Sequence, residues 1–175
     1  MPGTYEPIAT TTLANSTTNT LTFSSIPSTY TDLVFTVTGC LTLSDNVAGF
    51  RVNGDTGTNY SQTGLRGAGA AGTSFRETSQ SQLYLGWYPY PRSNAQGSVE
   101  TGNMTVHFMN YSNTAIYKSM FVSSSTGYGN SGTTINAALW RSNAAITSIT
   151  VLLTTTGTPY FTSGTTFTLY GIKAA

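Results

Sequence analysis

Apolar and polar side chains alternate along much of the chain, which is the pattern of β-strands that bury one face. Leu33, Phe35 and Val37 fall on one face of residues 32–38, and the segment 167–172 alternates in the same way. No long stretch repeats apolar residues at helical spacing. Residues 5–10 are predicted to form an edge strand or an N-terminal arm. Further strands are predicted at 20–24, 49–52, 82–87, 104–109, 117–123, 135–140 and 146–153.

Segments rich in Gly and Asn separate these strands, because both residues tolerate positive φ at little cost. About eight to ten short strands with turns at this spacing predict an all-β, antiparallel sandwich or barrel. No composition shift or internal repeat is present, so one domain is expected over residues 1–175, with 1–12 as the arm or edge strand.

The longest low-complexity stretch, residues 64–81, is predicted to be a surface excursion with little regular structure. It carries Arg66, Arg76 and Glu77, a notable share of the few charges. Two interpretations stay open: a solvated loop that its charges keep soluble, or an ordered loop that contacts another subunit.

Charge is scarce: 7% of the residues are Asp, Glu, Lys or Arg, against about 25% in a typical soluble domain. A hydrophobic fraction of 38% and an aromatic fraction of 12% still indicate a folded chain. The net charge is +1 and no basic cluster occurs, which argues against nucleic-acid binding. No apolar run is long enough to span a bilayer, and the residues after Met1 do not resemble a signal peptide.

Catalytic and metal-binding residues are equally scarce. The single cysteine, Cys40, excludes an intrachain disulfide and is expected at a strand end, while His107 is expected as a hydrogen-bonded strand residue rather than a ligand or base. Gly67, Gly69 and Gly72 formally match a dinucleotide fingerprint but lack its flanking strand and helix. The sequence therefore predicts no enzymatic activity, no cofactor and no metal.

The aromatic segment Trp87-Tyr88-Pro89-Tyr90-Pro91 is more informative. Its prolines prevent regular ladder hydrogen bonds, so the strand is expected to end near Trp87. Tyr88 and Tyr90 then project from a stiffened loop. They either cap the end of the core or contact a partner or a glycan, because rigid aromatic side chains lose little entropy on association.

Several segments together resemble small virion structural proteins of tailed bacteriophages. They are, in chain order, YEPIAT (5–10), FSSIPSTYTDLV (23–34), RVNGDTGTNYS (51–61), NYSNT (110–114) leading to Tyr117-Lys118, WRSNAAITSI (140–149) and FTSGTTFTLYGI (161–172). The last segment is similar to an F-x-x-G-(S/T)-x-F-x-L-Y-G-I ending of these proteins. Residues 64–98 match none of the blocks.

This resemblance implies a jelly-roll-like β-sandwich that often forms trimers and occurs on capsids as a decoration or cement protein, or in tail fibres. It brings no catalytic residues. The leading hypothesis is thus a non-enzymatic capsid decoration protein, made in the host cytoplasm, that binds the major capsid protein as a homotrimer and stabilises the shell. The candidate interface residues are Tyr5, Pro7, Ile8, Arg66, Arg76, Trp87, Tyr88 and Tyr90.

The alternative hypothesis is a receptor- or glycan-binding module at a tail tip, in which the partner is a glycan of the host surface. Its candidate contact residues are Tyr88, Tyr90, Tyr128 and Trp140. Neither hypothesis involves nucleic acid or a membrane.

Overall fold

The computed structural model describes residues 4–40, 47–85, 102–126, 132–154 and 160–173. Within these ranges the regular structure consists of strands alone, and no helix able to cross a membrane is found in them. The strands are β1 (Tyr5–Thr12), β2 (Thr20–Phe23), β3 (Asp32–Cys40), β4 (Val47–Val52), β5 (Tyr60–Ala68), β6 (Ala71–Gln80), β7 (Leu83–Tyr84), β8 (Gly102–Phe108), β9 (Lys118–Thr126), β10 (Gly132–Trp140), β11 (Ile149–Thr154) and β12 (Thr166–Ile172).

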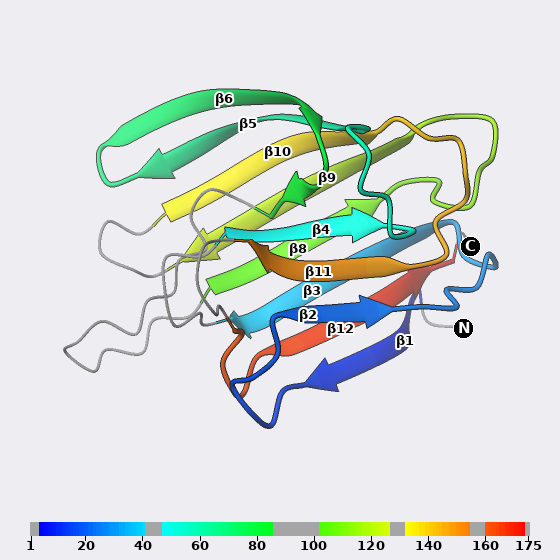
Figure 1. Cartoon of the computed structure of the whole chain (residues 1–175), viewed down its shortest axis with the longest axis horizontal. Helices are drawn as coiled ribbons and strands as arrows, with labels where there is room; N and C mark the ends of the chain where they lie inside the picture. The colour runs from blue at the N-terminus through cyan, green and yellow to red at the C-terminus, as the bar shows by residue number, and fades with distance from the viewer. Residues whose placement is uncertain (1–3, 41–46, 86–101, 127–131, 155–159, 174–175) are drawn as a thin grey trace.

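Two antiparallel sheets face each other in this structure (Figure 1). The larger sheet has eight strands in the order β1-β12-β3-β8-β9-β10-β5-β6. The smaller sheet has the order β2-β11-β4-β7 and covers one face of the larger one. The predicted all-β, antiparallel sandwich is therefore confirmed, with twelve strands among the described residues instead of the predicted eight to ten.

The core lies between the sheets and is built from the inward positions of the alternating strands. Phe50 of β4 meets Phe108 of β8 edge-on, with ring centroids 5.6 Å apart, and Phe23 of β2 meets Phe35 of β3 in the same way at 5.7 Å. Burying each of these side chains contributes about 2–3 kcal/mol. The predicted inward faces of 32–38 and 167–172 are buried as expected.

The segment 64–81 is a correction to the prediction, because it forms the β5–β6 hairpin and not an irregular excursion. A two-residue turn at Gly69 and Ala70 joins the strands, with Gly69 at a φ of 57°. Gly64 indicated a loop, yet the close packing of the sheet requires a glycine there. A Cβ at this position would lie 2.6 Å from the Cβ of Asn136 and 2.9 Å from Cζ of Phe75.

Several strand ends also differ from the prediction. β11 begins at Ile149 rather than 146, because the backbone N–H groups of Thr147 and Ser148 donate to Oδ1 of Asn53 at 2.8 and 3.1 Å. Residues 5–12 form an edge strand, β1, which pairs with β12. Cys40 is the last residue of β3, at a strand end as predicted.

Candidate binding face on the eight-stranded sheet

The side of the large sheet that is turned away from the small sheet is called the outer face here. Residue pairing places one continuous row of outward positions across all eight strands. In order from β1 to β6, this row is Pro7, Tyr170, Val34, His107, Phe121, Ala137, Thr63 and Arg76. The neighbouring row is Thr10, Thr168, Thr36, Thr105, Ser123, Ile135, Leu65 and Ser74.

These two rows carry very little charge. From β8 to β5 their one titratable side chain is His107, whose Nε2 lies 3.2 Å from Oδ2 of Asp32. The other oxygen of Asp32 accepts a hydrogen bond from the backbone N–H of Asn110 at 2.7 Å. His107 is therefore the hydrogen-bonded strand histidine that the sequence predicted, and hydroxyl and apolar groups make up the rest of this area.

Three large apolar side chains stand exposed on β9, β10 and β5, in the half of the outer face that ends at β6. Leu65 is 66% exposed, Ile135 47% and Phe121 45%. Leu65 and Ile135 are directly paired across β5 and β10, and Phe121 lies on the next strand, β9. We call these three residues the apolar cluster. Clustered exposed apolar side chains mark interaction sites more often than scattered ones do.

The polarity of β10 is inverted where it carries this cluster. Its outward positions include Ile135, whereas Thr134 and Asn136 point inward and are buried. Asn136 Nδ2 donates to Oε1 of Gln62 at 3.1 Å, and Gln62 Nε2 donates to Glu77 at 2.6 Å. Around β5 and β10 the sheet therefore has polar side chains on its inner side, of which Asn136, Gln62 and Glu77 are linked by hydrogen bonds, and apolar side chains on its outer side.

A shallow pocket of about 280 Å³ adjoins the apolar cluster. It lies across β8, β9 and β10 and is lined by Asn103, Thr105, Ser123, Ser124, Ser125, Thr133 and Ile135. Asn103 Oδ1 accepts from the N–H of Gly39 at 3.3 Å, and Thr133 Oγ1 donates to the carbonyl of Ser124 at 3.1 Å. Its lining supplies hydroxyl and amide groups and no acid or base, so the pocket suits binding of an uncharged group.

The sequence blocks around 51–61 and 140–149 meet at one end of the sandwich. Trp140 Nε1 donates to Oδ2 of Asp55 at 2.6 Å, and the N–H of Arg141 donates to the carbonyl of Asn59 at 2.8 Å. Burial tends to raise the pKa of Asp55, but hydrogen bonds from Trp140, Asn59 and the Gly57 N–H together hold it below its ordinary value. The two loops are thus tied into one rigid end.

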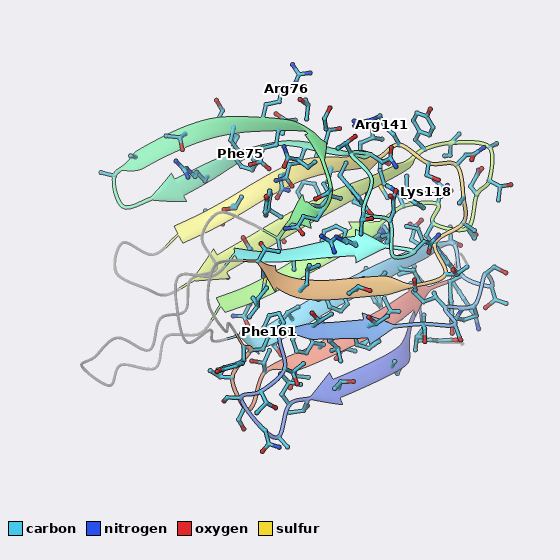
Figure 2. All side chains as sticks on the ribbon, viewed as in Figure 1. Phe75, Arg76, Lys118, Arg141 and Phe161 are labelled. Atoms are coloured by element: carbon cyan, nitrogen blue, oxygen red, sulfur yellow. The ribbon has the colours of Figure 1, made fainter. Side chains whose placement is uncertain are left out.

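Lys118 lies at the same end of the sandwich (Figure 2), and only 1% of its surface is exposed. Its Nζ donates to the carbonyls of Ile116 at 2.8 Å and Asn143 at 3.3 Å. Burial lowers the pKa of this ammonium group. The side chain therefore joins two loops, and above it Ile116 and Tyr117 remain exposed.

The predicted interface residues separate into distinct places. Tyr5 and Pro7 on β1 and Arg76 on β6 lie at opposite margins of the outer face. Ile8 is packed against the core at the bulge of β1, and Arg66 Nε donates to Thr73 Oγ1 at 2.7 Å. Trp87, Tyr88, Tyr90 and Tyr128 lie outside the described residues.

Trp140 requires a correction. Its side chain is only 3% exposed and its ring N–H is bonded to Asp55, so it presents no ring face on which a sugar could stack. The apolar cluster, in contrast, was not among the predicted sites. Its signal in the sequence is an apolar residue at the outward parity of a strand, such as Phe121 between Met120 and Val122.

Comparisons with known proteins add little to this geometry. No family model and no curated protein matches the chain. A marine PL-14 alginate lyase from Aplysia kurodai is 7% identical over 84% of this chain and 70% of that chain, with a TM-score of 0.32. The CBM2 module of an evolved Dit from Lactobacillus casei BL23 phage J-1 is 9% identical over 89% and 69%, with a TM-score of 0.19. Neither likeness bears on the function of this chain.

Proposed function

We propose that this chain is a non-enzymatic structural protein of a tailed-bacteriophage virion, a decoration protein that binds the outer shell through its outer face. The observation that carries the proposal is the inverted polarity of β10 and β5, where Ile135 and Leu65 face outward over an inner polar network. Covering the exposed half to two thirds of one such side chain on association contributes about 1–2 kcal/mol. A partner that covered these side chains would gain this contribution.

The scarcity of charge on the outer face supports the same proposal. Removing an unpaired charge from water is costly, whereas hydroxyl groups are desolvated at modest cost when they find new hydrogen bonds. His107, the one titratable side chain of the two rows between β8 and β5, already has Asp32 beside it. A face of this kind can be packed permanently against a neighbouring subunit.

In this proposal the location on a phage particle and the trimeric state are inferred from the sequence resemblance. Two of its blocks, 51–61 and 140–149, meet at the rigid end, where Oδ1 of Asn53 accepts hydrogen bonds from the N–H groups of Thr147 and Ser148. These hydrogen bonds hold the two blocks together. The virion location, the homotrimer and the major capsid protein as partner follow from that resemblance. Synthesis in the host cytoplasm is a further part of the proposal.

A pair of matched variants tests the role of the outer face. Ile135 and Ile116 are each 47% exposed, but only Ile135 lies on the outer face. Binding of purified protein to particles stripped of it is expected to fall at least about tenfold for Ile135→Asp and to stay unchanged for Ile116→Asp. Equal loss in both variants, or no loss in the first, contradicts the proposal.

A receptor- or glycan-binding module is the second candidate, and the pocket beside the apolar cluster favours it. Thr105 and Ser123 offer hydroxyl groups to an uncharged, hydroxylated ligand, and Phe121 stands next to them. A glycan array separates the two candidates. Glycan binding that is lost in Ser123→Val supports the receptor- or glycan-binding module. No glycan binding, together with lower stability of particles that lack the protein, supports the decoration role.

A further inference from the structure

The two edges of the eight-stranded sheet differ in how they are protected. At one edge, β1 carries Pro7 and a bulge between Pro7 and Ala9, two devices that block the pairing of a further strand. At the other edge, β6 pairs regularly with β5 from Ala71 to Glu77. Figure 1 shows β6 along the outer border of the sheet, at the opposite side from β1.

The hydrogen-bond pattern between β10, β5 and β6 determines which way the backbone groups of β6 point. Arg141 N–H donates to the carbonyl of Asn59, so the odd-numbered residues of the adjoining β5 are hydrogen-bonded to β10. The even-numbered residues of β5 are then bonded to β6, through Thr73 and Phe75 among others. The N–H and C=O groups of Gly72, Ser74 and Arg76 consequently point away from β5, toward an edge with which no other strand of the described residues pairs.

The side chains of this run do not obstruct a further strand. No proline or bulge lies between Ala71 and Glu77. Phe75 lies over Gly64, which anchors the middle of β6 to its neighbour. An anchored edge strand with regularly spaced free backbone groups is a template for pairing with another chain.

We propose that β6 pairs antiparallel with β6 of a second copy of this chain, about a two-fold axis at Phe75. In this register Ser74 of each copy is opposite Arg76 of the other, and each such pair exchanges both of its N–H···O bonds. Thr73 is then opposite Glu77 of the second copy. No two like charges are opposite each other, whereas a shift that centres the axis on Arg76 places two arginines together.

A second copy fits this edge, because the register about Phe75 opposes no like charges and uses the same residues of both molecules. The inference goes beyond the proposed function and does not depend on it, since the contact forms in the isolated protein. On a shell, such two-fold contacts would join neighbouring decoration proteins, while the outer face stays available to the particle.

Hydrogen exchange of the wild-type protein tests the pairing directly. At low concentration the amides of Thr73 and Phe75 are expected to be protected by β5, and those of Ser74 and Arg76 to exchange rapidly. Between about 10 µM and about 500 µM, Ser74 and Arg76 are expected to gain protection as the sedimentation coefficient rises. Association without protection of these two amides, or no association over this range, overturns the proposal.

Two variants at one position give an independent test. Ser74→Pro removes an outward N–H while leaving the bonds to β5 intact, and it is expected to weaken association at least about tenfold. Ser74→Ala keeps the N–H and is expected to associate as the wild type does. Circular dichroism shows whether the proline variant is folded, and equal association of the two folded variants rules the β6 pairing out. The outer-face variant Ile135→Asp is expected to leave this association unchanged, which separates it from particle binding.

Discussion

The ring of Tyr30 covers the backbone of Gly171, so that a Cβ on Gly171 would overlap the Cγ, Cδ1 and Cδ2 atoms of the ring. Three contacts fix the ring in this place. The Tyr30 hydroxyl donates to Oε2 of Glu6 at 3.3 Å, and the Tyr30 backbone N–H donates to the hydroxyl of Tyr111 at 3.4 Å. In addition, Nζ of Lys173 lies 5.5 Å from the centre of the Tyr30 ring. The glycine of the C-terminal L-Y-G-I segment is therefore a packing requirement.

Replacing this glycine is expected to destabilise the fold. Gly171→Ala forces Tyr30 away from β12 and is expected to lower the free energy of unfolding by about 1–3 kcal/mol, as overpacking does elsewhere. The matched control is Gly72→Ala, because no atom lies within 4 Å of a Cβ at that position. Denaturant unfolding of both variants checks the prediction, which is wrong if they lose the same amount of stability.

The β5–β6 hairpin offers a second comparison within one strand. A Cβ at Gly64 would clash with Asn136 and Phe75, whereas one at Gly67 would make an ordinary contact of 3.8 Å with Thr133. Gly64→Ala is expected to displace Phe75 and to speed amide exchange throughout β6, and Gly67→Ala to leave it unchanged. Unchanged exchange in the Gly64 variant would show that the hairpin does not depend on this contact.

The Asp55 carboxylate makes the free energy of unfolding depend on pH. Because its pKa is below the ordinary value of 3.8 in the folded protein, its contribution to stability is complete above that value and is lost as the pH falls through the folded pKa. Asp55→Asn is expected to be less stable than the wild type at neutral pH and to lose less stability on acidification. Unfolding free energies measured from neutral pH down to about pH 3 test this, and parallel pH profiles contradict it.

The alternation of apolar and polar side chains along the sequence was sufficient to predict the main strands of the sandwich. It located β3, β8 and β12 because each packs a regular apolar face, such as Leu33, Phe35 and Val37, against the core. It failed for β5 and β6, where Gly64 and a run of Gly, Ala, Ser and Thr have the composition of a loop. The close approach of Phe75 that requires Gly64 is visible only once the two strands are paired.

The candidate binding face could not be predicted from the alternation of apolar and polar side chains, because it depends on which strands pair. Leu65 and Ile135 are 70 positions apart in the sequence, and only the pairing of β5 with β10 makes them neighbours. The inward direction of Asn136 depends in turn on a partner, Gln62, that lies on a different strand. The sequence analysis predicts Tyr5, Pro7 and Arg76 as candidate interface residues, and the structure places them at the margins of the outer face.

The central claim is that this chain decorates a virion shell, and copy number tests it most directly. Quantitative proteomics of purified particles is expected to find the chain on the order of hundreds of copies per particle, in fixed ratio to the major capsid protein. Particles that lack it are expected to break at lower temperature, because a partner that binds only the assembled shell stabilises it. A few copies per particle, or none, would contradict the claim.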